Sequence, residues 1–68
     1  MSEAKGPRSY FPAIEKKYGE PIEHWMRQLE SVVTDTHMQQ VGFLKKQFGF
    51  GHGHANALVA VFRAERDL

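Results

Sequence analysis

Residues 49–56 read Gly-Phe-Gly-His-Gly-His-Ala-Asn and lie between two segments of apolar helical periodicity. The run holds three of the six glycines and two of the four histidines in the chain. Glycine loses more backbone freedom on folding than any other residue, so glycines at this density indicate a tight turn or a backbone that something else must approach. The run therefore predicts a hairpin between two helices, and it is the first place to look for a binding surface.

The segments on either side of the hairpin both follow helical spacing. The first begins at a cluster of N-cap residues, 34–36, and continues to residue 48. The second begins within residues 51–54 and continues to about residue 66. Their predicted buried positions are Met38, Val41, Leu44 and Phe48, then Ala55, Leu58, Val59 and Phe62. Gly42 costs its helix about 1 kcal/mol relative to alanine, which a close approach of two helices would explain.

Two more helices are predicted in the N-terminal half, over residues 12–18 and 21–33. Pro12 and Pro21 fit first-turn positions, where no N–H is needed. Pro12 also favours an extended Phe11, and Gly19 is typical of a left-handed C-cap. The stripe of the second helix consists of Ile22, Trp25, Met26, Leu29, Val32 and Val33.

The predicted fold class is all-α, with four short helices arranged as two helix-turn-helix hairpins. No segment alternates with a period of two for long enough to predict a strand. Residues 14–19, Ile-Glu-Lys-Lys-Tyr-Gly, resemble residues 44–49, Leu-Lys-Lys-Gln-Phe-Gly, as two related hairpins would. Residues 1–8 are polar and predict a disordered tail, which leaves residues 9–68 as a single helical domain.

Composition limits the classes of function. The chain has 68 residues, no cysteine and a formal net charge of +1. A near-neutral chain is not a dedicated electrostatic binder of nucleic acid. No apolar run approaches the roughly 20 residues of a membrane span. Together with the lack of cysteine, this predicts a cytoplasmic protein that does not enter membranes.

The hairpin offers backbone N–H groups to a ligand. Phe50 can anchor the turn inward, so that the N–H groups of residues 51–54 point out from the start of the fourth helix. Free amides and the helix dipole together make an anion site, and phosphate is the obvious ligand. The predicted anion-binding residues are Gly49, Gly51, His52, Gly53, His54 and Asn56. A plain glycine-capped turn, with the Asn56 side chain bracing it, is an equally weighted interpretation.

The pattern Gly49-Phe50-Gly51 followed by Ala55 resembles the helix-hairpin-helix DNA-binding motif. That resemblance implies that the hairpin amides hold a DNA phosphate without reading bases. Two departures weaken it. The first hairpin lacks the second glycine and carries Glu20, and histidines replace the basic residues expected after the second hairpin.

From residue 9 onward, the chain also looks like a small bacterial domain family of unknown function. The resemblance rests on Ser-Tyr-Phe-Pro at residues 9–12, on residues 14–19, and on Gly-His-Gly-His-Ala-Asn at residues 51–56. It implies a compact helical domain and supplies no activity.

The remaining polar residues indicate neither a metal nor a catalytic site. Zinc needs three or four ligands, so we interpret His52 and His54 as surface or capping residues and predict no cofactor. Protonated imidazoles beside helix amides would, however, bind phosphate more tightly at mildly acidic pH. The lysine doublets at residues 16–17 and 45–46 complement helix dipoles and form a weak basic edge.

The sequence therefore predicts a non-enzymatic binding module with one of two kinds of partner. The leading hypothesis is weak, non-specific contact with nucleic-acid phosphate through residues 49–56. The alternative is another protein, or a second copy of this chain, held by the broad apolar arc of the fourth helix. The sequence leaves the oligomeric state open.

Overall fold

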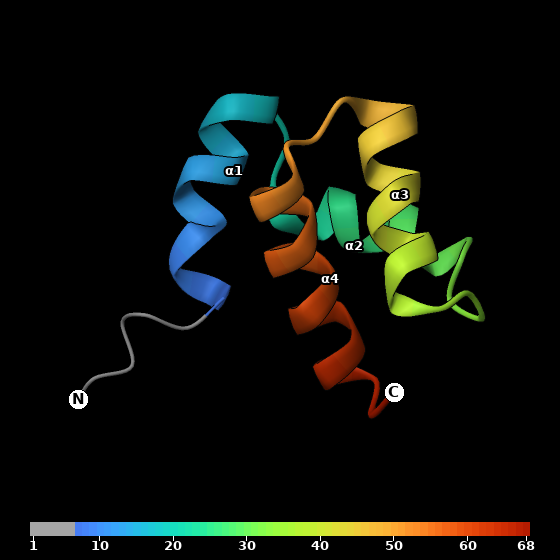
Figure 1. The fold of residues 1–68 in the computed structure, drawn as a ribbon. Coiled ribbons are helices and arrows are strands. Elements are labelled where there is room, and N and C mark those ends of the chain that lie inside the picture. Colours follow the sequence, from blue (N-terminus) through green and yellow to red (C-terminus); the bar gives the residue numbers. More distant parts are fainter. Residues whose placement is uncertain (1–6) are drawn as a thin grey trace.

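A computed structural model describes residues 7–68, which form a 3-10 turn, η2 (Pro7–Tyr10), and four α-helices (Figure 1). The helices are α1 (Phe11–Tyr18), α2 (Ile22–Glu30), α3 (His37–Phe48) and α4 (His52–Glu65). This part of the chain contains no strand, so the predicted all-α class is confirmed. In Figure 1, α4 descends between α1 and α3, with α2 behind them, and the α1–α2 and α3–α4 turns lie at the same end of the molecule.

The N-terminal prediction needs two corrections. Phe11 is the first residue of α1 and is not extended, because its half-buried ring packs on the core and this packing overrides the local bias from Pro12. Pro7 and Arg8, placed in the predicted tail, belong to η2. The Arg8 guanidinium donates to the Glu65 carboxylate at 2.7 Å. The rest of the predicted tail, residues 1–6, lies outside the described residues.

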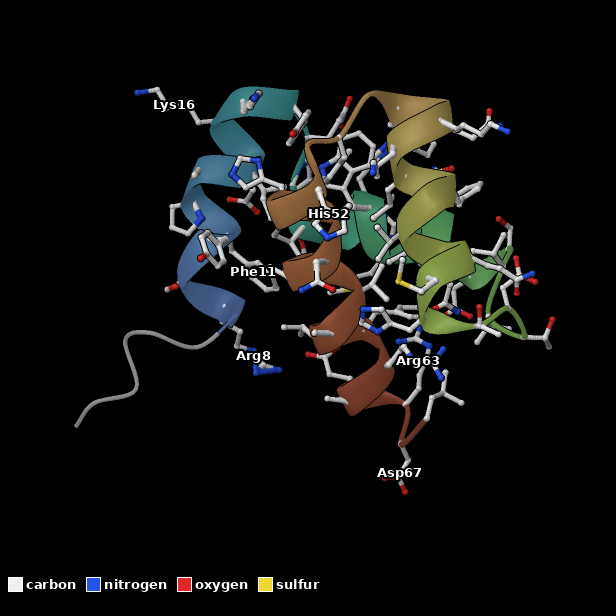
Figure 2. The ribbon with its side chains drawn as sticks, in the orientation of Figure 1. Arg8, Phe11, Lys16, His52, Arg63 and Asp67 are labelled. Atoms are coloured by element: carbon white, nitrogen blue, oxygen red, sulfur yellow. The ribbon has the colours of Figure 1, made fainter. Side chains whose placement is uncertain are left out.

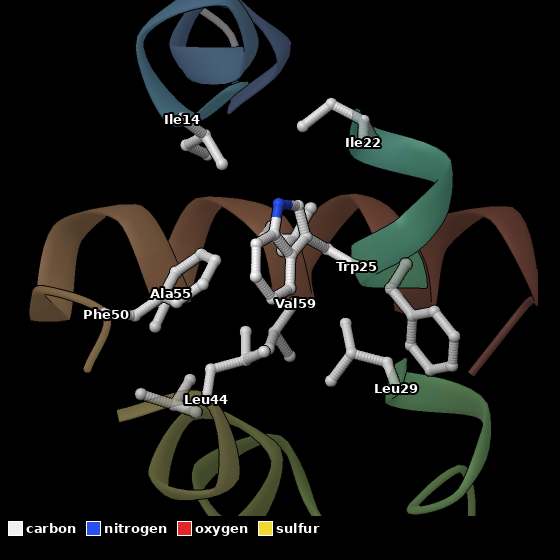
Figure 3. Packing of buried hydrophobic residues seen from close by; sticks show 11 residues of the cluster. Ile14, Ile22, Trp25, Leu29, Leu44, Phe50, Ala55 and Val59 are labelled. Carbon is white, nitrogen blue, oxygen red and sulfur yellow. The ribbon is translucent and has the colours of Figure 1, made fainter. Parts of the chain in front are cut away.

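Helix α4 is the centre of the fold, because it contacts η2, α2 and α3. Its predicted inner face is confirmed, and two further residues, Ala57 and Val61, are also buried. Figure 3 shows Ala55 and Val59 of α4 facing side chains from the other three helices. Burial of each large apolar side chain contributes about 1.5–3 kcal/mol. The core side chains are Ile14, Ile22, Trp25, Leu29, Val41, Leu44, Phe50, Ala55, Leu58, Val59 and Phe62.

Helix α2 is shorter than predicted at both ends. Pro21 is its N-cap, and the helix ends at Glu30. Val32 and Val33, predicted to be helical, lie in the turn that follows but still pack against the core.

Helix α3 departs from its predicted buried stripe. Met38, predicted to be buried, is 66% exposed, whereas Gln40 is fully buried. Gln40 lies inside because its amide hydrogen-bonds the carbonyl groups of the α2–α3 turn, which an apolar side chain would leave unpaired. Gly42 does not serve close helix approach, because a Cβ built there would meet nothing within 4 Å.

Candidate functional site

The α3–α4 hairpin is built from a left-handed glycine, a buried anchor and an extended glycine. Gly49 has φ +73°, and its N–H donates to the Lys45 carbonyl at 3.1 Å, which ends α3. Phe50 is 4% exposed and stacks on Tyr18 with ring centroids 4.0 Å apart, so its predicted anchoring role is confirmed. Gly51 is the extended N-cap of α4.

The first turn of α4 presents backbone donors that have no acceptor in the part of the chain that the structure describes. The first amide of this helix with a backbone partner is that of Ala55, which donates to the Gly51 carbonyl at 2.9 Å. Within residues 7–68, no acceptor lies on the N–H groups of His52, Gly53 or His54, and Gly51 has no side chain to cap them. These groups form the positive end of the helix dipole, which is the arrangement that anions bind.

Two residues of the predicted anion site, Gly49 and Gly51, have N–H groups that are already used within the chain, and the Gly49 N–H is the donor that ends α3. The Gly51 N–H donates to the Tyr18 hydroxyl oxygen at 3.0 Å, so this amide is consumed within the chain. The same hydroxyl lies 3.1 Å from Nδ1 of His54. Tyr18, at the end of α1, therefore holds the hairpin at two points. No local sequence pattern predicts this role of Tyr18, because 33 residues separate it from Gly51.

Asn56 does not belong to the hairpin surface. Its Oδ1 accepts a hydrogen bond of 2.8 Å from Nε2 of His37, the first residue of α3. The side chain therefore ties the second turn of α4 to the start of α3, and this bond replaces its predicted bracing of the turn. The bond uses the acceptor oxygen of the amide, so the predicted contact of the Nδ2 donors with an anion stays a prediction.

The two hairpins have similar left-handed glycines, but they differ in the group that meets the N-terminus of the following helix. Gly19 (φ +80°) donates to the Glu15 carbonyl at 2.9 Å, as Gly49 does to that of Lys45, so Glu15 and Lys45 hold equivalent places. The Glu15 carboxylate accepts from the N–H of Ile22, the first residue of α2, at 2.8 Å. An internal carboxylate therefore occupies the α2 terminus, whereas the equivalent residue at the α4 terminus is an exposed lysine.

A family model, Domain of unknown function (DUF4287), matches residues 6–64. The chain belongs to this family. The expected membership of a small domain family of unknown function is thereby confirmed, and the DUF4287 description names no activity. Searches of curated proteins and of solved structures found no match.

Exposed lysines flank the open turn of this DUF4287 domain. Lys16 and Lys17 lie in the last turn of α1, and Lys45 and Lys46 in the last turn of α3. Both helices end where the hairpins lie (Figure 1), and Figure 2 shows Lys16 directed away from the body of the molecule. Acidic groups lie at the same end of the molecule: Glu20 is exposed in the first hairpin, the Glu15 carboxylate meets the start of α2, and Glu23 lies in the first turn of α2.

The histidines of the DUF4287 domain lie apart or are engaged. Nδ1 of His54 faces Tyr18 and Nε2 of His37 faces Asn56, whereas His52 is exposed. Across residues 7–68, no three His, Cys, Asp or Glu side chains come together in a metal-binding arrangement. No helix in the described part of the chain has the length and apolar character needed to span a membrane.

Proposed function

We propose that this domain is a non-enzymatic binding module that contacts nucleic-acid phosphate through the first turn of α4, without base specificity. The observation that carries the proposal is the contrast between the two hairpins. Glu15 places an anionic group on the α2 terminus, whereas the N–H groups of His52, Gly53 and His54 have no acceptor in the described residues. Phosphate oxygens would supply those acceptors from outside.

The glycine at position 53 supports the same proposal. Gly53 lies within α4, and a Cβ built there would meet nothing within 4 Å, so neither conformation nor packing requires glycine. Glycine inside a helix costs about 1 kcal/mol relative to alanine. The absence of a side chain does keep the backbone open to a ligand that must reach the amides.

The charge distribution favours weak binding without sequence specificity. Four exposed lysines flank the open turn, but the net charge of the chain is only +1. Backbone amides and a few lysines contact phosphate and read no base edges. We therefore expect affinity that falls as salt displaces the few charged contacts.

A titration of ¹⁵N-labelled protein with duplex DNA tests the proposal. At about 50 mM salt, we expect shifts centred on the amides of His52, Gly53 and His54, and these shifts should shrink at about 200 mM salt. A lack of any shift at low salt would refute the proposal.

The variant Lys45→Glu sharpens this test. It puts a carboxylate at the position equivalent to Glu15, where we expect it to fill the α4 terminus and abolish the shifts. Lys46→Glu is the matched control, because it makes the same charge change in the same helical turn and should weaken binding only modestly. An equal loss in both variants would indicate general electrostatics and count against a site at the α4 terminus.

The apolar arc of α4 no longer favours the alternative of a dimerising domain. Of the residues that widen this arc, Ala57 and Val61 are each 5% exposed or less, and Ala60 is half-buried. The arc that motivated a second copy is therefore already used in the core, and the phosphate site remains the better supported proposal.

A further inference from the structure

The Tyr18 hydroxyl lies between a backbone donor and an imidazole nitrogen. It accepts from the Gly51 N–H at 3.0 Å and lies 3.1 Å from Nδ1 of His54. The ring is held in place by stacking on Phe50 at 4.0 Å and by an edge contact with Trp25 at 6.3 Å. The position of the hydroxyl oxygen is therefore set by packing on both sides.

This arrangement favours one of the two possible positions for the proton of the neutral His54 ring. A neutral imidazole has one N–H and one acceptor nitrogen, and a tyrosine hydroxyl has one proton to donate. Within residues 7–68, Nδ1 of His54 is the acceptor that the Tyr18 hydroxyl reaches, because its other contact, the Gly51 amide, is a donor. The hydrogen bonds are all satisfied when Nδ1 accepts and Nε2 carries the proton.

We propose that Tyr18 fixes His54 in the Nε2–H tautomer and thereby makes this imidazole a directed hydrogen-bond donor at the start of α4. The donor role rests on the proposed function, whereas the tautomer does not. No acceptor for Nε2 lies in the described part of the chain, and His54 is the third residue of α4, in the same turn as the open amides. A neutral ring in this tautomer can donate through Nε2.

The tautomer can be measured without any ligand. Long-range ¹H–¹⁵N correlation of the His54 ring at neutral pH should show the proton on Nε2 in the wild-type protein. Tyr18→Phe keeps the stacked ring and removes the hydroxyl, and it should give a mixture of tautomers. Tyr10→Phe is the matched control, because Tyr10 meets the His54 ring only edge-on, with centroids 6.2 Å apart. A wild-type proton on Nδ1 would overturn the proposal even if Tyr18→Phe did not fold, as would an unchanged tautomer in a folded Tyr18→Phe.

The donor role is tested with duplex DNA as the probe. Loss of one oriented neutral hydrogen bond should weaken binding by Tyr18→Phe about 2- to 10-fold, with Tyr10→Phe close to wild type. Equal binding by wild type and Tyr18→Phe would contradict the donor role. If the wild-type ring shows Nε2–H but DNA causes no shifts, the proposed function fails and the tautomer assignment stands.

Discussion

At the scale of single residues, one buried amide organises the connection between α2 and α3. Gln40 donates to the Val32 carbonyl at 2.8 Å and accepts from the Arg63 guanidinium at 3.1 Å. Arg63 also donates to the Asp35 carbonyl at 3.2 Å. Apolar periodicity could not predict this arrangement, because the partners of Gln40 are a carbonyl group eight residues back and an arginine 23 residues ahead. Apolar periodicity alone also led to the wrong prediction that Met38 is buried.

We predict that Gln40→Met destabilises the fold by about 1–3 kcal/mol, although methionine fills a similar volume. The cause is that the Val32 carbonyl and the Arg63 guanidinium lose a partner in a place that water does not readily reach. Urea unfolding followed by circular dichroism measures the effect. Gln47→Met, at an exposed position of the same helix, should stay within about 0.5 kcal/mol of wild type. Equal stability of the two variants would contradict this account.

At the scale of elements, α1 and α3 end alike, whereas the helices that follow them, α2 and α4, begin differently. Gly19 and Gly49 end α1 and α3 with left-handed backbones, as the sequence predicted, because this requirement is local. The start of α3 was also predictable, since Thr36 and Gln39 form a capping box within one turn. The hydrogen bond at the start of α2 was not predictable, because the Glu15 carboxylate meets the Ile22 N–H only after the chain has turned back between α1 and α2.

We predict that Glu15→Ala destabilises the protein by about 1 kcal/mol, because α2 loses both a hydrogen-bond acceptor and a favourable charge at its N-terminus. Glu20→Ala is the control: Glu20 is exposed in the adjoining turn and its loss should change the free energy of unfolding by less than about 0.5 kcal/mol. Urea denaturation of both variants at neutral pH gives the comparison. A larger effect at Glu20 would show that the net charge of the turn matters more than the cap.

At the scale of the whole molecule, α4 is surrounded by the rest of the chain. Its apolar face could be predicted because Ala55, Leu58, Val59 and Phe62 follow helical spacing. The pairing of α3 with α4 was predicted as a hairpin, but the contacts of η2 and α2 with α4 were not, because these elements are distant from α4 in the sequence. The glycine run was likewise recognisable as a hairpin. The hydrogen bond from the Gly51 N–H to the Tyr18 hydroxyl was not predictable, because it depends on how α1 packs against the hairpin.

We predict that Leu58→Ala removes a large fraction of the stability of the protein and markedly lowers its melting temperature. Leu58 is fully buried, and such a truncation costs about 2–5 kcal/mol. The total stability expected for a chain of this size is only about 3–10 kcal/mol. Leu68→Ala makes the same substitution at a residue that is 56% exposed and should leave thermal unfolding unchanged. A cooperative melt of Leu58→Ala close to that of wild type would contradict the central place of α4.

The packing of Trp25 also gives the protein an intrinsic fluorescent probe beside the α3–α4 hairpin. This is the only tryptophan of the chain, and its ring lies 5.0 Å from Phe50 and 5.2 Å from Phe48, on either side of Gly49. Its Nε1 is buried without an acceptor among the described residues, which favours emission at short wavelength. A movement of the hairpin would change the contacts of Trp25 with Phe48 and Phe50. The fluorescence emission of Trp25 therefore reports on the glycine turn in unlabelled protein.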